Sequence, residues 1–287
     1  MIAPTSKVLR QDGQRTSRVR LGHGVEVGGG DFVVIAGPCA LEHAEQVERT
    51  AAAVKQAGAH ALRGGAFKPR TSPYSFQGLG EVGLKLIAEQ GKKQNLPVVS
   101  EVMDAAQLDL MVDYVDVLQI GARNMQNFSL LRAVSKVKRP VVLKRGFAST
   151  IDEWLLAAEY LLDGGNEQVV LCERGIRSFD TTLRNTLDLA GMAYVRERSH
   201  LPVIVDPSHS TGVRSLVTPM SLAAAAAGAD GLLIEVHPAP DLALCDGPQA
   251  LTPELFEALM QALPPVLTAV GSRMSGQGHL AAVGGAR

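Results

Sequence analysis

Short apolar runs, mostly β-branched, alternate with longer segments of helical period from residue 32 onward. Such runs favour buried strands, and the segments between them favour amphipathic helices. The expected strands are residues 32–36, 59–63, 97–100, 115–120, 140–144, 168–172, 202–206 and 231–235. Eight successive strand–helix units predict an α/β protein with a closed, parallel (β/α)8 barrel of the TIM type.

Helix-capping signals agree with this parse. Thr150 and Glu153 form a capping box, and Thr218-Pro219 and Thr252-Pro253 each place a cap residue before a proline at the first helical position. A doubly wound open sheet is the alternative architecture. It requires a switch point and usually has fewer units, so the barrel is favoured.

Two flanks lie outside the expected barrel, which we assign to residues 31–270. Residues 1–30 are an N-terminal extension, and its segment 19–30 predicts a short hairpin around Gly22-His23-Gly24 that covers the barrel floor. Residues 271–287 are rich in Gly and Ala without periodicity, so we expect them to be disordered. Neither flank is large enough to form a domain of its own.

The composition excludes several classes of protein. Lys and Arg number 28 against 29 Asp and Glu, so no overall electric field attracts nucleic acid or an anionic membrane. The basic N-terminal residues precede no apolar stretch, which argues against a secretory signal. The apolar segment 222–236 is interrupted by glycines and an aspartate and is too short to span a membrane. We therefore expect a cytoplasmic protein.

Basic residues follow most of the expected strands, at the end of the barrel where active sites lie. They are Arg63, Lys68, Arg70, Arg123, Lys144, Arg145, Arg174 and Arg177. Clustered cations repel one another unless dianionic ligands neutralise them through charge-assisted hydrogen bonds. The set therefore predicts a phosphate- or carboxylate-binding site. The alternative for each residue is an ion pair with a helix carboxylate on the rim.

Four residues of metal-ligating type also follow strand ends: Cys39, His209, Glu235 and Asp246. A thiolate with an imidazole suits Fe(II), Zn(II), Co(II) or Mn(II), and two carboxylates add oxygen donors while leaving room for a substrate. We therefore predict an open, catalytic metal site. Taken singly, Cys39 is more often a buried small hydrophobe and His209 a hydrogen-bonded loop residue.

The other histidines and cysteines are interpreted as structural. His43, His60 and His237 are weaker ligand candidates, and Cys172 and Cys245 have no ligand spacing. An odd number of cysteines argues against a disulfide framework. The sequence also contains no GxxxxGK[ST] loop, GxGxxG turn, GxSxG elbow or HExxH helix, so nucleotide and serine-hydrolase chemistry are not favoured.

Seven motifs, in order at the expected strand ends, resemble the 3-deoxy-D-arabino-heptulosonate 7-phosphate (DAHP) synthase family in its short, type Iβ form. They are GPC at 37–39, KPRTS at 68–72, GARN at 121–124, LKRG at 143–146, CERGIR at 172–177, DPSHS at 206–210 and CDGPQ at 245–249. The resemblance covers about residues 31–265. It implies a metal-dependent barrel, usually a homotetramer, that condenses phosphoenolpyruvate with erythrose 4-phosphate in the first step of the shikimate pathway.

The resemblance also implies roles for individual residues. A divalent ion (Mn, Fe, Co or Zn) is expected on the four ligands named above. Substrate binding is implied for Arg63, Lys68, Arg70, Thr71, Ala122, Arg123, Lys144 and Arg174, of which Arg70 and Thr71 bind the aldose phosphate. In the expected mechanism C3 of phosphoenolpyruvate attacks the polarised aldehyde, and water adds at C2 before phosphate departs. We expect Lys68 to donate a proton and His209 to act mainly as a ligand.

Two alternatives stay open. A 3-deoxy-D-manno-octulosonate 8-phosphate (KDO8P) synthase uses the same enol donor with a five-carbon sugar, but that family typically reads KANRSS where residues 68–72 read KPRTS, and it lacks GARN. A phosphate-binding barrel without catalysis would be expected to have lost a ligand such as Cys39 or His209. Ala40 departs from the family, which often has Ser there. Because Ala40 lies next to Cys39, this change can alter the properties of the bound metal without abolishing binding.

We expect no feedback inhibition of the isolated chain by Phe or Tyr. Some relatives carry an N-terminal regulatory domain or a fused chorismate mutase, and neither flank of the barrel accommodates one. Titrating each amino acid into a steady-state assay tests this, and a saturating inhibition curve with either would contradict it. A partner protein can still supply such control.

Overall fold

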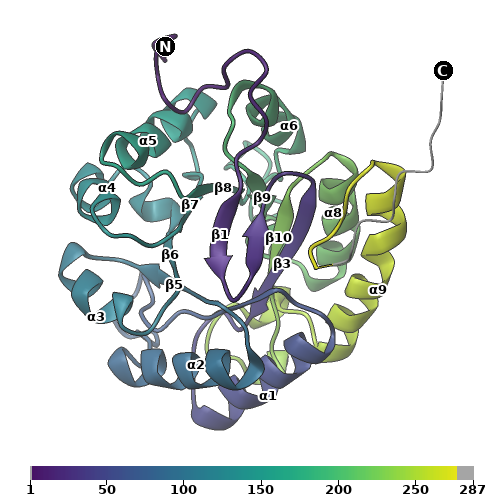
Figure 1. Ribbon diagram of the computed structural model, residues 1–287. Helices are drawn as coiled ribbons and strands as arrows, with labels where there is room; N and C mark the ends of the chain where they lie inside the picture. The colour runs from purple at the N-terminus through teal and green to yellow at the C-terminus, as the bar shows by residue number, and fades with distance from the viewer. Residues whose placement is uncertain (1, 277–287) are drawn as a thin grey trace.

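The computed structural model describes residues 2–276 and confirms the predicted (β/α)8 barrel (Figure 1). Its parallel strands are β3 (Asp31–Gly37), β4 (Ala61–Arg63), β5 (Val98–Val102), β6 (Val117–Ile120), β7 (Val141–Lys144), β8 (Val169–Glu173), β9 (Val203–Val205) and β10 (Gly231–Glu235). Strand β10 closes the ring by pairing with β3, from Gly231 opposite Val33 to Glu235 opposite Gly37. Closure leaves no free edge between the first and last strands of the barrel.

Helices surround the ring of strands in Figure 1. They are α1 (Ala44–Gln56), α2 (Glu81–Gln94), α3 (Leu108–Val112), α4 (Phe128–Ser135), α5 (Ile151–Asp163), α6 (Leu189–Arg198), α7 (Pro207–Thr211), α8 (Arg214–Ala226) and α9 (Pro253–Ala269). Within residues 2–276, no helix combines the length and the apolar character that crossing a bilayer requires.

The capping predictions succeed at two helices and fail at a third. Helix α5 begins with the capping box of Thr150 and Glu153, and α9 begins with Thr252 as its cap before Pro253. The prediction that a helix begins at Pro219 is wrong, because α8 starts at Arg214 and contains this proline. A proline inside a helix removes one hydrogen bond to the preceding turn but does not always end the helix.

Side chains of each strand alternate between two apolar layers. Along β3, Val33 and Ile35 point into the barrel, whereas Phe32, Val34 and Ala36 pack against the helices. The interior layer contains Val33, Ile35, Ala61, Val99, Val117, Val142, Val170, Cys172, Ile204 and Leu233. Burial in this layer raises the pKa of the Cys172 thiol. Apolar side chains thus fill the middle of the barrel.

The predicted hairpin is present and closes the floor of the barrel. Strands β1 (Val19–Gly22) and β2 (Val25–Val27) pair antiparallel and lie across the centre of the ring in Figure 1. Val19, Leu21 and Val27 join the interior apolar layer. The hairpin therefore completes the core at the end of the barrel opposite the carboxyl ends of the strands.

Part of the C-terminal segment is ordered, contrary to the prediction for residues 271–287. Strand β11 (Arg273–Met274) pairs in parallel with the start of β3. Met274 is buried in the outer core, and Arg273 lies 2.8 Å from Asp31. One apolar contact and one ion pair thus fix a segment whose composition gave no periodic signal. Residues 277–287, which the same prediction covers, lie outside the described residues.

Replacing Leu21 with Ala is expected to lower the free energy of unfolding by about 2–4 kcal/mol, because it leaves a cavity in the barrel interior. Leu21 is 1% exposed. Urea denaturation followed by circular dichroism measures the change. The neighbouring Arg20 side chain is 83% exposed, so Arg20→Ala is the control and should change stability by less than about 0.5 kcal/mol. Equal losses in both variants would contradict the role given to the hairpin.

Candidate active site

A cavity of about 310 Å³ opens at the carboxyl ends of the barrel strands. Loops that follow several different strands supply its lining, as expected for this fold. The residues predicted for the site that line it are Lys68, Arg70, Thr71, Ala122, Arg123, Lys144, Arg174, His209 and Asp246. Segments that are distant in sequence therefore meet in one concave, strongly cationic site.

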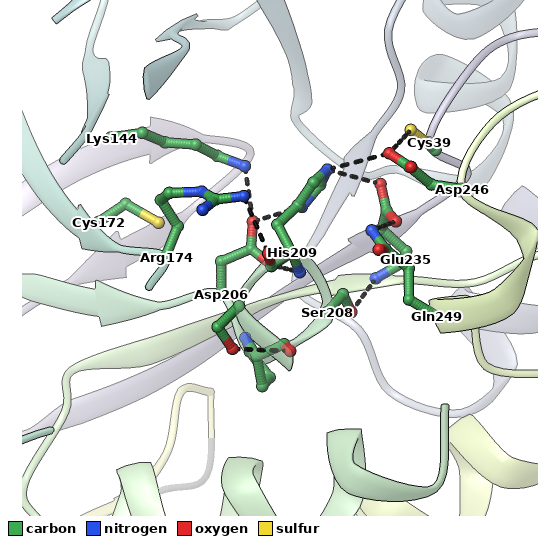
Figure 2. A network of polar contacts seen from close by, with 12 residues as sticks. Cys39, Lys144, Cys172, Arg174, Asp206, Ser208, His209, Glu235, Asp246 and Gln249 are labelled. Atoms are coloured by element: carbon green, nitrogen blue, oxygen red, sulfur yellow. Dashed lines mark hydrogen bonds and ion pairs between the residues drawn. The ribbon is translucent and has the colours of Figure 1, made fainter. Parts of the chain in front are cut away.

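The four predicted metal ligands lie together beside this cavity (Figure 2). One potential ligand atom from each of Cys39, His209, Glu235 and Asp246 lies within 4.8 Å of the other three. Cys39 follows β3, Glu235 ends β10, and His209 belongs to α7, the short helix after β9. Asp246 precedes the short 3-10 helix η4 (Gly247–Gln249). The barrel strands thus deliver donors from three separate parts of the chain to one point.

The distances between the donor atoms are short enough for one small ion to bridge them. His209 Nε2 lies 3.0 Å from Glu235 Oε1 and 3.8 Å from Asp246 Oδ2. Cys39 Sγ lies 3.3 Å from Asp246 Oδ2. Thiol, imidazole and carboxylate donors together suit a divalent transition metal.

Asp206 fixes the orientation of the His209 ring. Its Oδ2 lies 2.7 Å from His209 Nδ1, and its Oδ1 accepts a hydrogen bond from the His209 backbone N–H at 2.9 Å. Lys144 Nζ donates to the same carboxylate at 2.6 Å. Because Nδ1 is engaged, Nε2 is the atom that faces the cluster, which is the usual arrangement of a carboxylate, a histidine and a metal.

The electrostatics of the cluster also fit a cation. Burial disfavours the imidazolium, but the charges of Asp206 and Glu235 raise the pKa of His209 to about 10. Burial likewise opposes ionisation of Glu235, yet His209 and Arg63 hold the pKa of this carboxyl well below its usual range. The pocket therefore favours positive charge beside its carboxylates. The residues present fit a divalent cation in charge and in donor type.

Lys68 connects the ligand cluster to the cavity. Its side chain is buried, with Nζ 3.0 Å from the Cys39 carbonyl oxygen and 3.1 Å from Cys39 Sγ. Lys68 also lines the cavity. Its ammonium group can therefore act on a molecule that occupies the cavity and contacts the cluster.

Arg63 lies beneath the cavity and does not line it. It is 4% exposed, and its Nη1 donates to the Pro38 carbonyl oxygen at 2.7 Å and to Glu235 Oε1 at 3.1 Å. Its Nε has no hydrogen-bond partner among the described residues. Gly37 is required beside it, because a Cβ there would overlap the Arg63 carbonyl oxygen. Direct substrate binding by Arg63 stays a prediction.

Three guanidinium groups surround the ring of Phe147, which also lines the cavity. Their Cζ atoms lie 4.6 Å from the ring centroid for Arg174, 5.2 Å for Arg177 and 5.4 Å for Arg123. Cation–π contacts of this length are attractive. The ring thereby offsets the repulsion among neighbouring cations. Arg177 is exposed and does not line the cavity.

Arg145 belongs to the predicted basic set but does not line the cavity. Its Nη1 lies 2.8 Å from Asp188 Oδ2 and 3.1 Å from Glu173 Oε2. The ion-pair alternative is therefore correct for this residue. The structure also gives separate partners to the histidines that we interpreted as structural: His43 caps α1, His60 accepts from the Val34 N–H, and His237 contacts Glu42.

Sequence reasoning missed several residues of the site. Cys245, which we interpreted as structural, lines the cavity, its Sγ lies 3.2 Å from Cys39 Sγ, and Arg70 contacts it. Glu101 and Arg184 also line the cavity. Glu101 lies near the end of an expected strand, which was a usable signal, whereas Arg184 lies far along the loop after β8.

Comparisons with known proteins agree with these motifs. The model of the DAHP synthetase I family matches residues 11–268. Phospho-2-dehydro-3-deoxyheptonate aldolase of Thermotoga maritima is 47% identical over 275 residues, which are 96% of this chain and 81% of that protein. The crystal structure of the Thermotoga maritima protein superimposes with a TM-score of 0.92 and covers 96% of this chain and 80% of that one.

A second group of relatives is more distant. The 2-dehydro-3-deoxyphosphooctonate aldolase of Desulfatibacillum aliphaticivorans is 34% identical and spans 86% of this chain and 97% of that protein. The family match covers most of the chain, and the relative with the higher identity shares both sequence and fold. The chain belongs to the DAHP synthetase I family.

Proposed function

We propose that this enzyme is a DAHP synthase that condenses phosphoenolpyruvate with erythrose 4-phosphate and releases phosphate. The observation that carries the proposal is a cation-lined cavity opening directly onto a cluster of four metal-ligand donors. A divalent cation bound by this cluster supplies Lewis acidity toward the aldehyde oxygen. The cavity supplies the positive charge that two phosphorylated substrates require.

Charge neutralisation and positioning are the main tasks of the protein. Both substrates are anions, so bringing their reacting carbons together opposes Coulomb repulsion. We assign Arg123, Lys144 and Arg174 to the phosphate and carboxylate of phosphoenolpyruvate, and Arg70 and Thr71 to the aldose phosphate. All five residues line the cavity, which supports contact with the substrates, and the division between the two substrates follows the resemblance to the family. Preorganised cations of this kind stabilise developing charge without reorganising during the reaction.

Lys68 is the proposed proton donor. Burial lowers its pKa, but the electrostatic influence of the ionisable side chains of Cys39, Cys245 and Glu101 raises it, so that the net pKa lies above the ordinary value. The side chain therefore remains an ammonium at neutral pH. Such a group donates a proton readily only to a strongly basic atom, such as the oxygen of an aldehyde under attack at carbon.

KDO8P synthesis is the alternative function, which the second group of relatives favours. The two functions differ in the sugar, and the motifs that distinguish the families are KPRTS and GARN. Arg70 and Thr71 of the first motif and Ala122 of the second line the cavity. The four-carbon sugar is therefore the proposed substrate.

The wider biological setting is also a proposal. We infer that the enzyme acts in the cytoplasm as a homotetramer, in the shikimate pathway that leads to chorismate and the aromatic amino acids, with a partner protein as a source of feedback control. The family match supports the pathway. Light scattering of the purified protein tests the tetramer.

Metal-reconstituted enzyme is expected to consume phosphoenolpyruvate with erythrose 4-phosphate but not with arabinose 5-phosphate. Loss of the enol absorbance follows the reaction, and removing the metal with a chelator should abolish it. Preference for the five-carbon sugar would move the function to KDO8P synthesis. No turnover with either sugar by metal-bound protein would contradict the proposed function.

Metal binding is expected to release about two protons near neutral pH, because metals bind the deprotonated forms of histidine and cysteine. The pKa of His209 is raised to about 10, and the hydrogen bond with Cys245 and burial raise the pKa of Cys39 well above its usual range. Both groups therefore carry protons before binding, and apparent affinity should rise with pH.

Calorimetric titration of the metal in Hepes and in Tris measures this release, since the two buffers differ in ionisation enthalpy. The Cys39→Ser variant should release about one proton fewer, because a serine hydroxyl has no thiol proton to lose at this pH. A binding heat that is independent of the buffer would contradict the protonated state given to the two ligands.

A further inference from the structure

The side chain of Arg184 joins the loop after β8 to both carboxylates of the metal cluster. Its Nη1 lies 3.3 Å from Asp246 Oδ1 and donates to Gln249 Oε1 at 2.8 Å. The Gln249 amide nitrogen in turn donates to Glu235 Oε2 (Figure 2). One guanidinium group therefore reaches the first carboxylate directly and the second through a single amide.

These contacts, together with the Arg63 Nη1 that donates to Glu235 Oε1 at 3.1 Å, orient the two carboxylates toward the cluster. Asp246 Oδ2, the oxygen that Arg184 does not bind, lies 3.8 Å from His209 Nε2. Glu235 Oε1, the oxygen that Gln249 does not bind, lies 3.0 Å from the same nitrogen. A hydrogen bond to one oxygen limits rotation of a carboxylate and leaves the other oxygen for the metal.

The amide of Gln249 has only one orientation that satisfies both of its partners. Gln249 is 2% exposed, so its polar atoms depend on protein partners. A guanidinium group has only donors, and an ionised carboxylate has only acceptors. The amide oxygen must therefore face Arg184 and the amide nitrogen must face Glu235, which makes Gln249 a rigid relay between them.

Asp246 needs such an anchor more than the other ligands do. Its backbone lies in the left-handed region, with φ of 54°, and its side chain is 26% exposed. Arg184 is itself 37% exposed, and ion pairs at this exposure add little to the stability of a fold. The contact is therefore better suited to fixing a ligand than to stabilising the barrel.

We propose that Arg184 is a positioning residue that sets metal affinity and coordination geometry by orienting Asp246 directly and Glu235 through Gln249. The inference rests on the proposed function, since it requires a cation in the cluster. Arg184 also lines the cavity, where its guanidinium can instead serve as a ligand for a substrate phosphate. A positioning role predicts weaker metal binding when Arg184 is replaced, whereas a role as substrate ligand predicts a change in KM alone.

A titration of metal-free protein with Co(II) separates these roles without any substrate. Competition with a chelator gives the affinity, and the ligand-field spectrum of Co(II) reports the coordination geometry. Arg184→Gln is expected to weaken Co(II) binding about 10- to 100-fold and to change the spectrum. Gln249→Met, which keeps the size but loses both hydrogen bonds, should do the same to a smaller extent. Because both act on one network, the double variant should lose less than the product of the single effects.

Two further variants test whether the effect comes from loss of positive charge or from the loss of any arginine. Arg184→Lys keeps the charge but has a shorter side chain, so its ammonium cannot occupy the position of Nη1, which makes both contacts. It should remain folded and still bind Co(II) more weakly. Arg49→Gln is the matched control. Arg49 belongs to α1 and its side chain is 61% exposed, so this variant should bind Co(II) like the parent chain.

Unchanged Co(II) affinity and spectrum in Arg184→Gln would overturn the proposal. If that variant also had a raised KM for the aldose phosphate, Arg184 would be a substrate ligand instead. Failure of the parent chain itself to bind Co(II) would count against the proposed metal-dependent function as a whole, and is therefore distinguishable from failure of this inference alone.

Discussion

Closure of the barrel between its first and last strands is the constraint on which the site depends. The register that places Glu235 opposite Gly37 brings the end of β10 beside the segment that carries Cys39. Because this pairing is parallel and its residues are buried, a shift by one residue would turn Glu235 away from the cluster. The hydrogen bonds that close the fold thus also set the distance between two of the candidate metal ligands.

Charge balance is the second constraint, and the site meets it by pairing each buried group with a specific partner. Asp206 holds both Lys144 and His209, so one buried anion organises a cation of the cavity and a ligand of the cluster. Breaking a buried pair by removing one partner is costly, because the other charge is left without compensation. The candidate metal cluster and the cationic cavity are therefore coupled electrostatically through Asp206.

The barrel, and the grouping of the four candidate ligands, could be predicted from the sequence because both depend on features that a single chain displays. Apolar runs mark the strands, and a parallel barrel gathers the residues that follow them at one end. Contacts between loops are different, because no periodicity places Arg184 beside Asp246 or Cys245 beside Cys39. The same limit explains β11, which depends on pairing with β3 and on the burial of Met274.

Ligand type alone does not specify a metal site, since the same four residues with freely rotating carboxylates would present several geometries. Here three of the candidate ligands are held by neighbouring side chains: His209 by Asp206, Glu235 by Gln249, and Asp246 by Arg184 from the loop after β8. These partners come from segments that also line the substrate cavity or lie next to it. Loop sequence can therefore change the geometry of the candidate metal site without changing any of its four donors, because the orientation of the donors depends on neighbouring side chains.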